Sequence, residues 1–235
     1  MSVASRPIVR PTNTAVPPLV NGDRLTRPEF ERRYHAMPGV NKAELIEGVV
    51  HMPSPVRINS HSKPHARIVT LLGVYEAATP GTEVGDNGSL RLDLDNMPQP
   101  DAYLRIHESR GGQSRISSDD YLEGAPELVI EIAGTSAAVD LHSKLVAYRR
   151  NGVREYVVWL TDDHEIRAMR LVDGVYVPIA PDDAGVVRLE TFPGLWLNVP
   201  ALLELDASQP LKTLQQGLAG PEHAAFREKL QSTAK

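Results

Sequence analysis

The stretch Leu128-Val129-Ile130-Glu131-Ile132 places a carboxylate inside an otherwise apolar run. A short apolar run of this kind is typical of a strand buried in the middle of a sheet. Burying a carboxylate without a partner costs several kcal/mol, so such an acid usually needs a metal ion, a cation or a hydrogen-bond donor beside it. We therefore expect Glu131 to mark both the centre of the fold and a functional site.

Two further residues lie against apolar sequence. Asp101 follows Pro100 at the start of the next apolar run. Lys144 has Leu141 and Tyr148 at offsets of three and four, so its side chain is expected on the packed side of a helix. Two acids and a lysine in such surroundings are the minimum set for metal-dependent cleavage of a phosphodiester.

The two acids suit a hard divalent cation if their strands are neighbours. Mg²⁺ and Mn²⁺ prefer oxygen ligands, typically one or two carboxylates with water and substrate phosphate. A metal bound by Asp101 and Glu131 can position a water and neutralise developing charge. Lys144 close by can orient or deprotonate that water and stabilise the transition state.

Each of these residues also has a purely structural interpretation. Lys144 could form a surface ion pair with Asp140, worth about 0.3–0.5 kcal/mol. Glu131 could pair with a buried arginine, and Asp101 could cap the end of the proline-rich loop. The three residues together are more specific than any one of them alone.

Two secondary candidates are Glu44 and His65. Glu44 begins an expected strand and could add a ligand or hold a water, although a strand end at the surface is the alternative. His65, near a helix start, could donate to phosphate or orient an acid. His61 and His65 are four apart and could suggest a zinc pair, but Pro64 lies between them and no third ligand is evident.

The pattern of the chain predicts one mixed α/β domain at 25–204, a flexible N-terminal arm at 1–24 and a peripheral helical tail at 205–235. A capping box from Thr26 to Glu29 is expected to start the first helix. The polar segment 107–124 is expected to be a long loop near the site, with Arg105, Arg110 and Arg115 as substrate contacts. Helices are expected at 27–34, 65–78 and 141–151, and strands at 44–50, 90–94, 101–106, 128–132, 156–160, 166–171, 175–179 and 186–189. The strand–helix–strand order at 128–160 predicts a parallel pair.

Composition excludes several classes of protein. The 235 residues are 41% hydrophobic and 23% charged, as in ordinary globular proteins. There is no cysteine, which excludes disulfides, thiolate metal sites and cysteine nucleophiles. No stretch approaches the roughly 20 apolar residues of a membrane span, and the N-terminus lacks a secretory pattern, so we expect a cytoplasmic protein without membrane contact. The net charge of −5 argues mildly against sequence-blind DNA binding but not against an acidic metal site.

The order of motifs resembles a known family, the Uma family of bacterial restriction-endonuclease-like proteins, within the PD-(D/E)XK nuclease superfamily. The resemblance covers about 43–199 and is most specific from Glu131 to Trp159. The residues that carry it are Glu44-Leu45-Ile46-Glu47-Gly48, Met52-Pro53-Ser54-Pro55, His65, Ile68, Pro100-Asp101, Pro126-Glu127-Leu128-Val129-Ile130-Glu131-Ile132, Asp140, Lys144, Tyr148, Gly152-Val153-Arg154-Glu155-Tyr156 and Trp159.

The resemblance implies a restriction-endonuclease-like core, a mixed β-sheet flanked by helices, with Asp101 and Glu131 as metal ligands. The superfamily's lysine normally lies two residues after the acid, where this chain has Ala133. Its function then maps onto Lys144 in the following helix. A second departure is Ala133-Gly134-Thr135-Ser136, where relatives carry a Ser-Pro-Ser type of turn.

The leading hypothesis is therefore a Mg²⁺- or Mn²⁺-dependent DNA endonuclease, with Glu44 and His65 in supporting roles. The alternative is a catalytically inactive module that kept the nuclease fold and binds nucleic acid or a protein. Double-strand cleavage would favour a homodimer, since each site cuts one strand.

Overall fold

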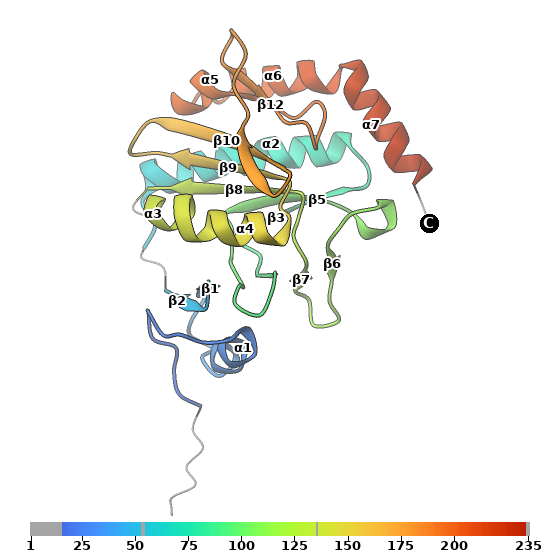
Figure 1. Ribbon diagram of the computed structural model, residues 1–235. Helices are drawn as coiled ribbons and strands as arrows, with labels where there is room; N and C mark the ends of the chain where they lie inside the picture. Colours follow the sequence, from blue (N-terminus) through green and yellow to red (C-terminus); the bar gives the residue numbers. More distant parts are fainter. Residues whose placement is uncertain (1–15, 53–54, 135, 234–235) are drawn as a thin grey trace, which may run out of the picture.

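The apolar run around Glu131 forms strand β8 (Leu128–Ala133), and all of its residues are buried. The computed structural model describes residues 16–52, 55–134 and 136–233. β8 lies inside a six-stranded mixed sheet with the order β11-β10-β9-β8-β5-β3 (Figure 1). The other strands of this sheet are β3 (Thr82–Asp86), β5 (Ala102–Ile106), β9 (Glu155–Leu160), β10 (Glu165–Val172) and β11 (Val175–Pro178).

The connection between β8 and β9 confirms the predicted parallel pair, in which Glu131 lies opposite Val158. The chain between these strands forms α3 (Ala137–Val139), the π-helical turn η3 (Asp140–Lys144) and α4 (Leu145–Asn151). Gly152 ends the helix in a left-handed conformation, with φ of 83°. The sequence signals for this unit are local, which is why they predicted it well.

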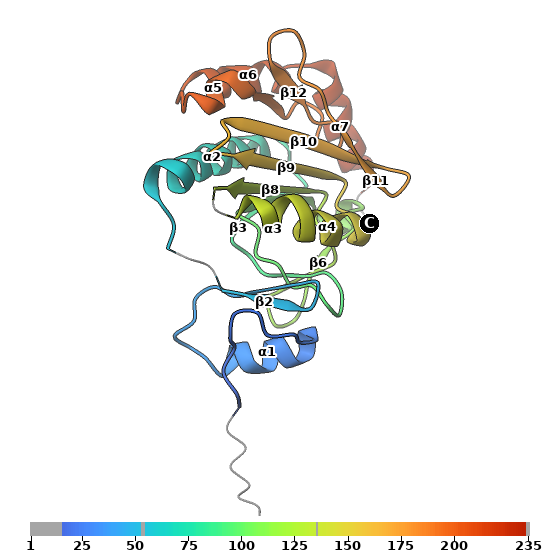
Figure 2. The ribbon, with the colours of Figure 1, turned by 60° about the vertical axis from the view of Figure 1, so that its left-hand side comes forward.

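Alternation along the strands gives the sheet two buried faces. Leu128, Ile130 and Ile132 pack with α2 (Lys63–Ala78) on one face. Val129 and Ala133 pack with Tyr148 of α4 on the other. Figure 2 shows the resulting layers, with α3 and α4 on one side of the sheet and the C-terminal helices on the other.

The C-terminal part of the chain completes the first of these cores. It comprises β12 (Val186–Arg188), β13 (Trp196–Asn198), α5 (Val199–Leu203), α6 (Gln209–Leu218) and α7 (Pro221–Ser232). Leu214 and Leu230 belong to the same apolar cluster as Ile68 of α2. Helices from the expected peripheral tail thus contribute residues to the main core, and β13 and α5 were not expected.

The N-terminal segment has a smaller core of its own, formed around α1 (Arg27–His35) and the hairpin of β1 (Glu44–Ile46) and β2 (Val49–His51). Leu19 is 4% exposed in this core, and the Gly22 amide donates to the Val50 carbonyl at 2.8 Å. Residues 16–24 of the expected arm thus contact this core, and residues 1–15 lie outside the described part of the chain. Positive φ angles at Glu47 and Gly48 form the turn of this hairpin, within the stretch 44–50 that was expected to be strand.

The capping box is also wrong, although the helix that it predicted is present. The Thr26 side chain makes no capping hydrogen bond. Glu29 instead pairs with Arg32 at 2.8 Å and Arg33 at 2.6 Å, both within the same helix. Two arginines on its own helix face outcompete the neutral backbone amide for this carboxylate.

The expected strand at 90–94 is mostly absent. β4 covers only Leu90–Arg91, and Leu94 is 62% exposed. Asp93 Oδ1 accepts hydrogen bonds from the Asp95 amide at 2.8 Å and the Asn96 side chain at 2.9 Å. This side-chain turn ends the strand, against the alternating hydrophobic pattern.

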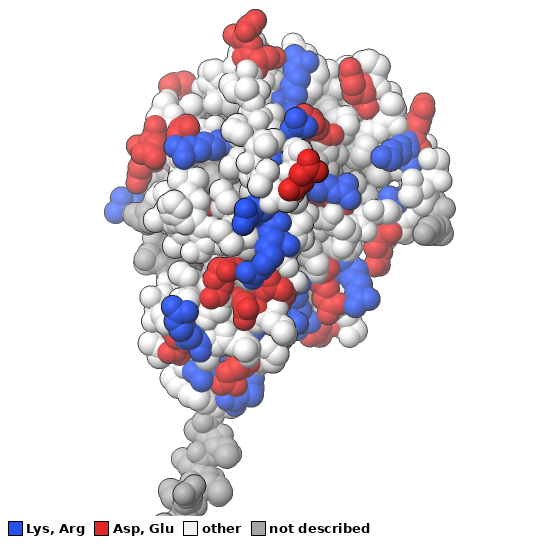
Figure 3. Space-filling view, viewed as in Figure 1, with Lys and Arg blue, Asp and Glu red and all other residues white. Residues whose placement is uncertain are grey.

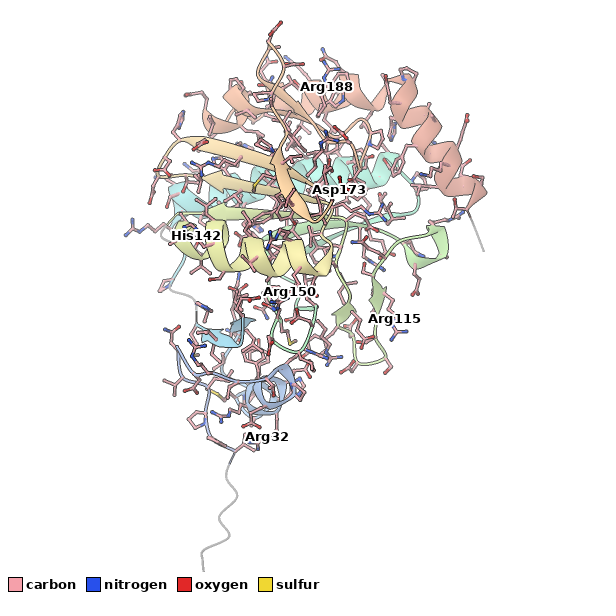
Figure 4. The ribbon with its side chains drawn as sticks, in the orientation of Figure 1. Arg32, Arg115, His142, Arg150, Asp173 and Arg188 are labelled. Carbon is pink, nitrogen blue, oxygen red and sulfur yellow. The ribbon has the colours of Figure 1, made fainter. Side chains whose placement is uncertain are left out.

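The polar segment 107–124 was expected to lie near the acids, but the structure places it elsewhere. It begins where β5 ends, at Ile106, whereas Asp101 precedes the other end of that strand. It carries the 3₁₀ turn η2 (Glu108–Arg110), β6 (Arg115–Ile116) and β7 (Leu122–Glu123). In Figure 4, Arg115 lies far from His142, a residue of the η3 turn. The direction of β5 decides at which end of the strand the segment lies, and the composition of the loop carries no information on that direction.

No helix in the described ranges is both long enough and apolar enough to cross a membrane.

A buried acid far from Asp101 makes stability depend on pH. Glu155 is fully buried at the start of β9 and accepts a hydrogen bond from the Glu190 amide at 2.7 Å. Burial raises the pKa of Glu155 from 4.5 to about 7. Because the folded protein holds this proton more tightly than the unfolded chain, the contribution to stability is full below pH 4.5 and is lost as the pH rises to about 7.

Glu155→Gln is therefore expected to gain stability relative to the wild type as the pH rises. Between about pH 4 and pH 8 the difference in free energy of unfolding should shift by about 3 kcal/mol in favour of the variant. Urea titrations across this range measure it, with the exposed Glu190→Gln as the control. Parallel pH profiles for the wild type and Glu155→Gln would contradict the assignment.

Candidate active site

Asp101 and Glu131 meet because their strands are neighbours in the sheet. β5 and β8 are antiparallel and pair Ala102 with Ile130, so the register places Asp101 opposite Glu131. The Ile132 amide donates to Asp101 Oδ2 at 2.7 Å, and the Asp101 amide lies 3.4 Å from Glu131 Oε2. Asp101 is 5% exposed and Glu131 is 2% exposed, so the two carboxylates form a buried pair.

Lys144 reaches this pair from the face of the sheet that α3 and α4 cover. Its Nζ lies 3.0 Å from Glu131 Oε1, 2.9 Å from Glu44 Oε1 and 3.4 Å from Asp140 Oδ1. Lys144 and Asp140 are both buried, which rules out the interpretation of a surface ion pair. The structure thus brings Glu44, Asp101, Glu131 and Lys144 together, as the sequence had suggested.

The helix that carries Lys144 has an unusual local shape. Residues Asp140–Lys144 form a π-helical turn, and the preceding Ser136 donates to Asp140 Oδ2 at 2.6 Å. Single π-helical turns are rare and occur frequently at functional sites. Residue 135 of the predicted departure from the family turn lies outside the described residues.

Hydroxyl groups complete the hydrogen bonding of the acids. Tyr148 donates to Glu131 Oε1 at 2.8 Å, and Tyr156 donates to the Asp140 carbonyl at 2.9 Å. Sequence reasoning used Tyr148 only as an apolar neighbour and gave Asp140 only a surface role. The one-turn spacing of Tyr148 from Lys144 could have indicated that both face Glu131.

Two histidines approach Asp101 from the start of α2. His61 Nε2 lies 3.1 Å from Asp101 Oδ1, and His65 Nε2 lies 2.8 Å from the Asp101 carbonyl. His65 also lies 2.9 Å from Asp86 Oδ1, so it braces the backbone and does not contact the reactive oxygens of the acids. His61 belongs to a second π-helical turn, η1 (Ile58–Ser62), and α2 begins at Lys63, close to Pro64 as expected.

The electrostatics of the cluster are dominated by burial. Burial raises the pKa of Glu131, against the opposing effect of Lys144. Burial likewise raises the pKa of Asp140. For Lys144, burial acts to lower the pKa, but Glu131, Glu44 and Asp140 together raise it well above its usual value. Four buried acids share one buried lysine, so the raised pKa values of Glu131 and Asp140 reflect a cluster that favours an added proton or cation.

The donor set decides which cation the residues fit. Across residues 16–52, 55–134 and 136–233, no group of three or more His, Asp or Glu side chains is arranged to hold a metal ion. Zinc sites need three or four protein ligands, whereas Mg²⁺ is commonly held by one or two carboxylates with water and substrate. The pair of Asp101 and Glu131 therefore fits Mg²⁺ or Mn²⁺ better than zinc.

Comparison with known proteins identifies the family and the fold. A family model described as "Uma2: Putative restriction endonuclease" matches residues 27–200. The fold is similar to a crystal structure from Anabaena variabilis ATCC 29413, described as a "putative nuclease belonging to DUF820", with a TM-score of 0.57 and 14% identity over 74% of this chain and 97% of that chain. No curated protein matches the chain significantly. The family resemblance and the expected α/β fold class, a mixed sheet flanked by helices, are confirmed.

Replacing the buried Lys144 should lower the stability of the protein, because the buried acids lose their cation. Lys144→Met removes the cation shared by Glu131, Glu44 and Asp140, and is expected to lower the free energy of unfolding by about 3–5 kcal/mol. Adding Glu131→Gln should recover part of that loss, because one charge then no longer needs a partner. Denaturant titrations of the single and double variants measure both effects. A Lys144→Met protein as stable as the wild type would contradict the buried network.

Proposed function

The chain belongs to the Uma2 family, and on that premise we propose that it is a metal-dependent endonuclease that hydrolyses phosphodiester bonds in DNA. The observation that supports this most strongly is the buried pair of Asp101 and Glu131 with Lys144 at 3.0 Å from Glu131. The nuclease description of the Anabaena structure supports the same class of reaction.

Asp101 and Glu131 would hold the metal ion. Glu131 Oε1 accepts from Lys144 and Tyr148, while among the described residues Oε2 has only the long 3.4 Å contact with the Asp101 amide. Asp101 Oδ2 is bound to the Ile132 amide, while Oδ1 faces the half-exposed His61. A metal ion would therefore bind Glu131 through Oε2, and at Asp101 Oδ1 it would share the oxygen with His61. A bound Mg²⁺ or Mn²⁺ supplies a more acidic water and neutralises charge on the phosphate.

The other residues prepare this pair. Lys144 would donate hydrogen bonds to the attacking water or to the phosphate oxygens on which charge develops. Glu44 fixes Lys144 at 2.9 Å and also accepts from the Gln99 amide at 2.8 Å. His65 orients the Asp101 backbone, so its role is positioning.

A non-catalytic module is the second candidate. It is favoured by the saturation of Glu131 Oε1 by Lys144 and Tyr148, which stabilises the acid without a metal. It is also favoured by the formal net charge of −5. This candidate predicts nucleic-acid or protein binding with no cleavage at any metal concentration.

Cleavage of supercoiled plasmid in the presence of Mn²⁺ separates the two candidates. The wild type should nick the plasmid, and Asp101→Ala and Glu131→Ala should each lower the rate on the order of 100-fold or more, because the metal site is lost. Asp182→Ala, which removes an exposed acid from the loop before β12, is the matched control and should retain the wild-type rate. Equal cleavage by the wild type and Asp101→Ala would contradict the proposed site.

A further inference from the structure

Asp101 differs from the deeper acids of the cluster because one of its oxygens faces partly exposed side chains. His61, 3.1 Å from Asp101 Oδ1, has a side chain that is 22% exposed. Lys42, 3.9 Å from the same oxygen, is 28% exposed. Glu131 and Lys144, by contrast, are only 3% and 6% exposed. We call the partly exposed surface formed by Lys42 and His61 beside Asp101 Oδ1 the entrance to the acid pair.

Both of these side chains are held in place at this entrance. Lys42 Nζ donates to Asn87 Oδ1 at 3.0 Å, so a neutral acceptor positions the ammonium group, which is paired with Asp101 only at 3.9 Å. The His61 ring stacks on that of His65 with centroids 5.8 Å apart. An ammonium group and an imidazole fixed beside an acid pair are suited to contact an anion that spans the entrance.

Several basic side chains outside this entrance already have partners. Arg105 pairs with Glu83, Arg115 pairs with Glu123 at 2.7 Å, and Arg110 donates to the last carbonyls of α7 at 3.3 Å. Over α4, basic and acidic side chains lie side by side in Figure 3, and Arg150 pairs there with Glu47 and Asp93. Acids therefore offset the charges of Arg105, Arg115 and Arg150, whereas Arg110 contacts neutral carbonyls at α7.

We propose that Lys42 and His61 contact the phosphodiester backbone of duplex DNA at the entrance to the acid pair. This inference rests on the proposed function, because it identifies the residues that bring the substrate to Asp101. Lys42 supplies an ionic contact to a phosphate that does not depend on the base sequence, and His61 supplies a hydrogen bond next to the acid. The arginines at 105–115, which loop composition favoured, lie toward the end of β5 that is remote from Asp101.

Binding of a fluorescein-labelled DNA duplex in EDTA, followed by anisotropy over a range of salt concentrations, tests this without any metal. Lys42→Ala should weaken binding and reduce the slope of log K against log salt by about 0.9, the value for one lost phosphate contact. His61→Ala should weaken binding about fivefold, as for one lost hydrogen bond. Lys212→Ala, an exposed lysine on α6, is the matched control and should leave the slope unchanged.

Lys42→Gln guards against a folding defect, because it can keep a hydrogen bond to Asn87 while losing the charge. It should reproduce the slope change of Lys42→Ala. A wild type that binds no duplex, or equal slope changes for the Lys42 and Lys212 variants, would overturn the proposal. Plasmid cleavage is measured separately. If DNA binding depends on Lys42 but no cleavage occurs, only the endonuclease proposal is refuted. If cleavage occurs but the Lys42 variants bind DNA as the wild type does, only this inference is refuted.

Discussion

The structure depends on one electrostatic constraint, the burial of Glu131 on a central strand. A carboxylate at that depth is stable only with a cation and donors around it. Lys144 and Tyr148 supply them from the helix that crosses over between β8 and β9. That helix is therefore attached to the sheet by apolar packing and also by the ion pair of Lys144 with Glu131, which is buried away from water.

The same constraint ties the N-terminal hairpin to the sheet. Lys144 binds Glu44 at the start of β1 as closely as it binds Glu131. Two π-helical turns, at Asp140–Lys144 and at Ile58–Ser62, carry side chains that reach this cluster from opposite sides. Packing alone does not require such turns, so their position beside the acids links the local backbone shape to the site.

The sequence predicted the centre of the site because each of its signals is local. Glu131 and Asp101 stand out against apolar runs, and Lys144 stands out by helical spacing from Leu141 and Tyr148. The family resemblance added Lys144 as the substitute for a lysine at position 133. The parallel β8–β9 pair followed from the strand–helix–strand order of the sequence, and the family resemblance implied the mixed sheet.

The remainder depended on tertiary contacts that no spacing encodes. Asp140 was given a surface role because its burial depends on Ser136 and on the sheet beneath it. His61 was considered only for zinc, since its contact with Asp101 requires α2 and β5 to meet. The 107–124 segment was placed at the wrong end of β5 because composition carries no information on strand direction.

The central claim is that the acid pair holds a divalent cation, and isothermal titration calorimetry with Mn²⁺ tests it most directly. The wild type should bind Mn²⁺ at a site that Asp101→Asn loses, while both proteins keep the same melting temperature in EDTA. Absence of Mn²⁺ binding by the folded wild type, or equal binding by Asp101→Asn, would contradict it.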